Sequence, residues 1–271
     1  MDIWGYGFFI RAVAAGVLCG FACPLVGVFL VARRYSFFAD ALAHIALAGV
    51  ALGIILNLSP HVITLLVVVG AAFAVEWLRQ RRRFHADALL ATVMAAGLSL
   101  GVILVSKSRG FGADLTGFLF GSLLTISPID LQMIALLVLV AAGTVFLFYK
   151  HLFVIALDEE YARAAGLKVT LVNTAFILVA ALTVAVALRA VGVLLTGALV
   201  VVPVLIAVRV NRSFRGTVAT AVAAGITLVL GGLHVAYVAD LPPGPAIVLL
   251  GVAVLAVIII IEEFYKSLRR A

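Results

Sequence analysis

Long runs of apolar residues, separated by short polar or charged stretches, follow one another along almost the whole chain. Each run lasts about 18 to 25 residues, the length of an α-helix that crosses the hydrocarbon core of a bilayer. Strands of a membrane barrel would instead alternate apolar and polar positions over about ten residues. The pattern predicts an all-α polytopic membrane protein with eight or nine transmembrane helices. Nine segments can be drawn, at residues 8–32, 37–58, 62–78, 86–106, 128–148, 170–188, 191–208, 216–238 and 245–261.

Composition supports the same class of protein. Hydrophobic residues make up 66% of the 271-residue chain and charged residues only 11%, more apolar surface than a water-soluble domain can cover. No shift in composition marks a domain boundary, so residues 1–271 are expected to form a single transmembrane domain. A net charge of +7 would suggest nucleic acid if it formed one patch, but the basic residues lie at segment ends. There they act as a topology signal, and no nucleic-acid partner is expected.

The basic residues predict which side of the membrane each connection faces. Of the 19 lysines and arginines, 15 fall on one side of the nine-segment arrangement. The positive-inside rule makes that side cytoplasmic. We therefore expect a multi-pass membrane protein, in contact with lipid, with a cytoplasmic C-terminus and an N-terminus outside.

Two connections are too long to be simple turns. The outer one contains an apolar stretch at residues 115–124, which is too short to span and predicts a re-entrant or interfacial helix. The inner one carries three consecutive acids from Asp158 to Glu160, then Arg163 and Gly166. This order predicts a short amphipathic helix that starts at the acids and stops at the glycine. Acids are uncommon on a positive-inside face, so the loop either contacts a partner or is an ordinary solvated helix.

Asp40 and His44 are the candidate metal-binding residues, four positions apart inside the second segment. That spacing puts a carboxylate and an imidazole on one helix face, where both can bind a single divalent ion. Ionisable groups within a membrane span are costly and usually face a cavity, a pathway or a partner. The alternative is that Asp40 is a charge at a helix N-terminus and His44 a packing residue.

Motifs for the common catalytic sites are missing from the sequence. There is no G-x-x-x-x-G-K-[ST] for nucleotide binding, no H-E-x-x-H and no zinc-finger spacing of cysteine and histidine. The string GLSLG at 97–101 has the letters of G-x-S-x-G, but it lies inside an apolar helical segment and not at the strand-to-helix turn that this motif requires. The chain is therefore expected not to be an enzyme, and to hold no permanently bound cofactor.

Five strings in order along the chain resemble the metal-uptake ABC permeases, the membrane subunits of bacterial zinc and manganese importers. They are RRYSFFADALAHIALAGVALG at 33–53, ADLTGFLFGSLL at 113–124, LDEEYARAAGL at 157–167, LTVAVALRAVGVLLTGALVVVP at 182–203 and DLPPGPAIVL at 240–249. The resemblance covers nearly the full length. Residues 36–44 and the ending PPGPAIVL are most similar to the zinc permeases.

The resemblance implies a type II-like ABC importer permease fold, in which two copies of the chain pair around a central pathway. Two separate ATPase subunits on the cytoplasmic side would use ATP, and an extracytoplasmic metal-binding protein would deliver the ion. The transported ion would be Zn²⁺, or alternatively Mn²⁺ or iron, with the chain as the transport subunit. An ion-coupled secondary metal transporter is a further alternative, but it needs membrane-embedded acids, which are nearly absent beyond Asp40.

The same resemblance assigns roles to particular residues. The D-x-x-x-H element of the family's pathway falls on Asp40 and His44. The ATPase-coupling helix falls on Leu157, Asp158, Glu159, Glu160, Tyr161, Ala162, Arg163 and Gly166. His234, in GGLHVAYVAD, departs from the family pattern and is either an additional pathway ligand or a harmless change. His61, at the outer turn, could meet an arriving ion or be a loop residue.

Overall fold

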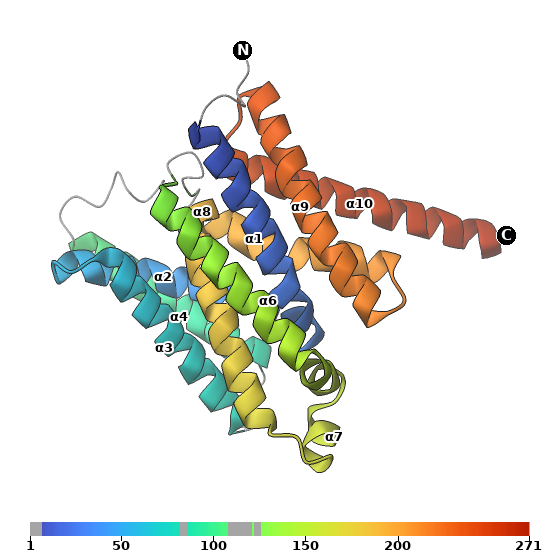
Figure 1. The fold of residues 1–271 in the computed structure, drawn as a ribbon, viewed down its shortest axis with the longest axis horizontal. Coiled ribbons are helices and arrows are strands. Elements are labelled where there is room, and N and C mark those ends of the chain that lie inside the picture. Colours follow the sequence, from blue (N-terminus) through green and yellow to red (C-terminus); the bar gives the residue numbers. More distant parts are fainter. Residues whose placement is uncertain (1–6, 82–85, 108–120, 122–125, 271) are drawn as a thin grey trace.

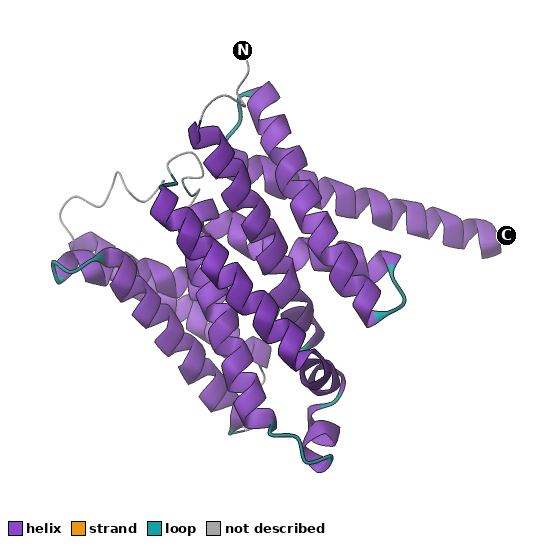
Figure 2. Cartoon of the chain, viewed as in Figure 1, coloured by secondary structure: helices purple, strands orange, loops and turns teal. Residues whose placement is uncertain are grey.

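A computed structural model describes residues 7–81, 86–107, 121 and 126–270, and these ranges contain only helices, turns and loops (Figures 1 and 2). Eight of the helices are long and apolar enough to cross a membrane. The all-α, polytopic prediction is therefore confirmed. In chain order the helices are α1 (Gly7–Ala32), α2 (Phe38–Ile55), α3 (Pro60–Gln80), α4 (Ala86–Lys107), α6 (Pro128–Leu157), α7 (Glu159–Ala164), α8 (Val169–Val210), α9 (Phe214–Ala239) and α10 (Pro243–Arg270).

Two of the nine predicted segments, 170–188 and 191–208, belong to the single element α8. At 42 residues, α8 would be roughly 63 Å long if straight, about twice the hydrocarbon thickness of a bilayer. It is not straight, because Gly192 has φ 83° and ψ 170°, outside the helical region. Only glycine adopts this conformation readily. The arms at 169–191 and 193–210 run in different directions in Figure 1.

Three helices form the interior of the bundle. In α1, α2 and α8, more than half of the most apolar 18 consecutive residues are buried in the bundle. In α6, only 17% of the corresponding stretch is buried. Helices α3 and α4 pack on α2, α6 and α9 pack on α1, and α10 packs on α8 and α9. Figure 1 shows α2, α3 and α4 on one side of α1 and α8, with α9 and α10 on the other.

Small residues allow α1 to approach its neighbours closely. A Cβ atom at Gly27 would collide with the backbone carbonyl of Val200 in α8, and one at Gly225 in α9 would collide with the carbonyl of Gly20. Such contacts are typical of membrane helices, where van der Waals packing rather than water exclusion holds helices together. They fix the second arm of α8 against α1.

The predicted re-entrant stretch at 115–124 lies outside the described residues, apart from Gly121. The backbone of Gly121 has φ 72° and approaches Val191 and Gly192 too closely to leave space for a Cβ atom. The kink of α8 is therefore in contact with the outer connection.

Candidate functional site

Asp40 lies in the first turn of α2, and its carboxylate faces the second arm of α8. A Cβ atom built at Gly197 would lie 3.0 Å from Asp40 Cγ and closer still to Oδ1. The missing side chain of Gly197 is therefore what leaves room for the carboxylate. The positive end of the α2 dipole also favours a negative charge at this position.

His44 lies one turn further along α2, where α4 approaches. A Cβ atom at Gly97 of α4 would lie 2.9 Å from the backbone nitrogen of Ile45 and 3.2 Å from the carbonyl carbon of His44. Both Asp40 and His44 are partly buried. The structure thus places the two predicted ligands on one helix between α4 and the second arm of α8.

Neither side chain is used by the fold as described. Within residues 7–81, 86–107, 121 and 126–270, no hydrogen bond or ion pair involves the side chain of Asp40 or His44. The same ranges contain no group of three or more His, Cys, Asp or Glu side chains that could hold a metal ion. Among the described residues, a single chain therefore contributes at most two such ligands here.

The two additional histidine candidates lie elsewhere. His61 is exposed at the start of α3 and lines a cavity of about 300 Å³ with Asp130 and Arg189, whose side chains form a 2.8 Å ion pair. His234 is exposed on α9, which packs on α1, α8 and α10. Neither histidine joins Asp40 and His44 in a three-ligand group within the described part of the chain.

The acidic inner connection forms the short helix α7, as the sequence predicts. The side chain of Asp158 caps its N-terminus by accepting hydrogen bonds from the backbone nitrogens of Glu160 and Tyr161, each at 2.9 Å. At the other end, Gly166 has φ 80°, and the Gly166 and Leu167 N–H groups donate to the carbonyls of Arg163 and Ala162. These two bonds define a Schellman motif. Gly166 therefore ends the helix, as expected.

Helix α7 has one anchored face and one open face. Ala162 is fully buried, whereas Leu157 and Tyr161 leave 69% and 66% of their surface exposed. Glu159 accepts hydrogen bonds of 2.7 Å from both Arg79 of α3 and Arg163. Burial would raise the pKa of Glu159, but these two hydrogen bonds outweigh it and hold the pKa below its ordinary value.

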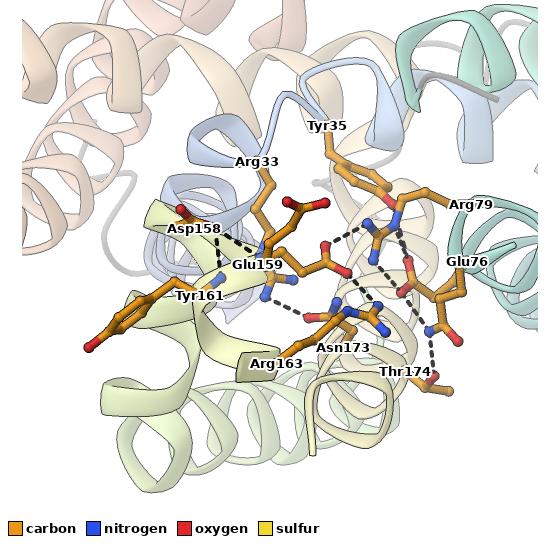
Figure 3. A network of polar contacts seen from close by, with 12 residues as sticks. Arg33, Tyr35, Glu76, Arg79, Asp158, Glu159, Tyr161, Arg163, Asn173 and Thr174 are labelled. Atoms are coloured by element: carbon orange, nitrogen blue, oxygen red, sulfur yellow. Dashed lines mark hydrogen bonds and ion pairs between the residues drawn. The ribbon is translucent and has the colours of Figure 1, made fainter. Parts of the chain in front are cut away.

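A buried polar network connects α7 to the beginning of α2 (Figure 3). Glu76 of α3 is 1% exposed and accepts hydrogen bonds from Tyr35, Arg79 and Gln80. The contact of Glu76 with Arg79 is local, three residues along α3, whereas Glu76 meets Tyr35 and Arg79 meets Glu159 only through the fold. These partners are 41 and 80 residues apart, so no local pattern reveals them.

Arg33 and Asn173 lie beside this network. The Arg33 guanidinium donates a 2.7 Å hydrogen bond to Asn173 Oδ1, joining the end of α1 to α8. Burial lowers the pKa of Arg33 to about 10, so the group is still charged at neutral pH. Arg33 Nε and Asn173 Nδ2 remain buried without a hydrogen-bond partner. The surroundings of α7 are therefore rich in charge, and two of the buried nitrogen atoms there have no hydrogen-bond partner among the described residues.

These features are those of an integral-membrane permease. Within its described residues the chain has eight helices apolar enough to span a membrane, a carboxylate and an imidazole partly buried in one of them, and a short helix anchored between two others. The chain belongs to the ABC 3 transport family, whose sequence model matches residues 5–262. The prediction of an ABC importer permease fold is confirmed.

Two relatives and one solved structure illustrate the similarity. The high-affinity zinc uptake system membrane protein ZnuB of Haemophilus influenzae is 32% identical over 88% of this chain and 91% of its own length. The manganese transport system membrane protein MntC of Halalkalibacterium halodurans is 27% identical over 92% and 85%. The structure of PsaBC from Streptococcus pneumoniae in complex with Fab superimposes with a TM-score of 0.82 at 24% identity, over 94% of this chain and 92% of that one.

Proposed function

We propose that this chain is the permease subunit of an ATP-driven importer of divalent transition metal ions, and that Zn²⁺ is its cargo. The observation that carries the proposal is the Asp40–His44 pair, which is partly buried in a membrane span and has no protein partner in the described residues. Ionisable groups are retained in such places when they serve a pathway.

The chemistry of the pair favours a transient zinc site. Zinc binds imidazole nitrogen and carboxylate oxygen well, whereas manganese prefers more oxygen ligands. One chain supplies two ligands, and a second copy related by two-fold symmetry would supply two more. Four ligands contributed by two separate chains suit an ion that must enter and leave.

Because the relatives include proteins named for zinc uptake and for manganese transport, both ions are candidate cargoes. Because most nitrogen–oxygen sites prefer zinc to manganese, an importer of manganese would depend on its delivery protein for selection. Manganese is therefore the second candidate, with the same fold, pathway and motor.

The motor would be a separate pair of ATPase subunits that dock on α7 from the cytoplasm. Exposed Leu157 and Tyr161 supply an apolar contact, and Asp158 and Gly166 fix the two ends of the helix. The positive-inside distribution supports cytoplasmic placement of α7 and of the C-terminus. An extracytoplasmic metal-binding protein would deliver the ion at the opposite face.

Reconstitution with the ATPase and the metal-binding protein tests the proposal. Liposomes that contain the complex should take up radioactive zinc only when ATP is present on the side of the membrane where the ATPase subunits are bound. Zinc should also stimulate ATP hydrolysis more than manganese or iron does. Asp40→Ala and His44→Ala should each abolish uptake. His151→Ala is the matched control, because His151 is an exposed histidine of α6 outside the pair.

Three results would contradict parts of the proposal. Wild-type zinc uptake by the Asp40→Ala/His44→Ala double variant would remove the site assignment. Stimulation by manganese in preference to zinc would change the cargo alone. Uptake driven by a proton gradient without ATP would replace the importer with an ion-coupled transporter.

A further inference from the structure

Glu76 is the one charged side chain classed as buried in the described ranges, and neither the metal pathway nor the ATPase contact uses it directly. Its carboxylate accepts hydrogen bonds from Tyr35 Oη at 3.0 Å, from Arg79 at 2.9 and 3.0 Å, and from Gln80 Nε2 at 2.8 Å. A buried carboxylate without partners is strongly unfavourable, so these groups are held together as one unit.

Arg79 joins this unit to α7. Its guanidinium contacts Glu76 through Nε and Nη2, and donates a 2.7 Å hydrogen bond to Glu159 Oε2 through Nη1. A planar guanidinium holds both carboxylates in fixed directions, which a flexible ammonium group could not do. Figure 3 shows Arg79 between Glu76 and Glu159. Displacement of α7 therefore pulls on α3 through the charge-assisted contact between Glu159 and Arg79, and the contact of Arg79 with Glu76 holds the two α3 side chains together.

Tyr35 joins the same unit to the beginning of α2. Its ring lies 6.1 Å from the ring of Phe38, and its carbonyl accepts a 3.0 Å hydrogen bond from the Phe38 backbone nitrogen. The Arg79 guanidinium also stacks near the Tyr35 ring, at 5.7 Å from its centroid. Asp40 follows two residues after Phe38, in the first turn of α2.

We propose that Glu76 and Arg79 are positioning residues that carry the movement of α7 to the first turn of α2 and so set the place of Asp40. The inference rests on the proposed function for its role in transport, but the mechanical link itself depends only on the contacts above. Coupling between two sites requires a physical element that both can shift, and this network supplies one. The network brings α7, α3 and the start of α2 into contact, although these segments are far apart in the sequence.

Hydrogen–deuterium exchange of the full chain in lipid nanodiscs tests the link without cargo or motor. Glu159→Gln removes the charge that Arg79 contacts on α7 and keeps the side-chain size. The expected result is faster amide exchange, by about fivefold or more, both in α7 and at residues 41–45 of α2. Arg209→Gln, which breaks a 2.8 Å ion pair between α8 and α10, should leave residues 41–45 unchanged. An effect of Glu159→Gln confined to α7 and α3 would overturn the proposal.

Transport stoichiometry tests its role in the reconstituted complex. Glu76→Gln keeps an acceptor for Tyr35 but loses the charge, and should lower the zinc ions moved per ATP hydrolysed by about fivefold or more while ATP hydrolysis continues. This ratio does not depend on the amount of folded protein, so a purely structural role would leave it unchanged. A wild-type ratio in Glu76→Gln would refute the coupling role. If the wild-type complex moves neither zinc nor manganese, the proposed function fails, and the exchange experiment still decides the link.

Discussion

Replacing Gly197 with alanine should block transport while the fold survives. The added methyl group would occupy the space that the Asp40 carboxylate uses, since a Cβ atom there lies 3.0 Å from Asp40 Cγ. The atoms that it meets are the end of a flexible side chain, which can rotate away. By contrast, nothing lies within 4 Å of a Cβ atom at Gly143 in α6, so Gly143→Ala is the matched control.

The expected magnitudes follow from these contacts. Extra volume in a packed interior lowers the stability by about 1–3 kcal/mol. Because the Asp40 side chain can rotate away from the added methyl group, we expect Gly197→Ala to cost about 1 kcal/mol, at the low end of this range. A hydrogen bond to a charged group is worth about 1.5–3 kcal/mol, and we assign the Asp40 carboxylate a contribution of that size to holding the ion. Loss of the Asp40 contact would therefore weaken ion binding in the pathway by roughly 10- to 150-fold.

Radioactive zinc uptake by the reconstituted complex measures the effect, with thermal unfolding of the purified chain as the check on folding. Gly197→Ala should unfold within a few degrees of wild type but transport little zinc, and Gly143→Ala should match wild type in both. Normal transport by Gly197→Ala would refute the orientation of Asp40 toward the pathway. Complete loss of folded Gly197→Ala protein would show that the carboxylate cannot move aside.

Three further predictions concern the packing and the coupling helix. Gly27→Ala should destabilise the chain by about 2–3 kcal/mol, seen as a lower Tm, because the methyl group meets the rigid backbone of Val200; an unchanged Tm would contradict the close approach of α1 and α8. Gly166→Val should cost about 1–2 kcal/mol at its left-handed φ and speed amide exchange in α7, whereas equal exchange would argue against the Schellman motif as its stop. The depressed pKa of Glu159 gives stability that is present above its ordinary value of 4.5 and lost as pH falls through the lower folded value. The Tm difference between wild type and Glu159→Gln should therefore be present at pH 7 and shrink below pH 4.5, and a difference that grows on acidification would have the wrong sign.

Local chemistry made much of this fold predictable. The apolar runs specify membrane helices, and the acids and glycine of residues 158–166 specify the start and stop of α7, because each signal acts within a few residues. The predicted interruption between segments 170–188 and 191–208 falls at residues 189–190, two residues before the break observed at Gly192. The sequence does not reveal that hydrogen bonding resumes directly after Gly192, so that both segments form one bent element.

The candidate site was predictable only in part. The spacing of Asp40 and His44 is a local property of α2, but the room that the Asp40 carboxylate occupies depends on Gly197, 157 positions later in the numbering. In the same way, Tyr35 and Glu159 meet the Glu76–Arg79 pair only through tertiary packing. Contacts of this kind follow from how helices dock, and a single sequence carries no periodic signal for them.

The glycine contacts between α1 and its neighbours have a consequence for temperature. In a soluble protein, the hydrophobic contribution to stability weakens on cooling, and below the temperature of maximum stability the protein becomes less stable. Helices α1 and α8 meet through Gly27 and Val200 in surroundings that are apolar before and after they associate. Their association therefore lacks the term that fades at low temperature. The interior of this bundle should remain tightly packed in the cold, limited by the fluidity of the lipid around it.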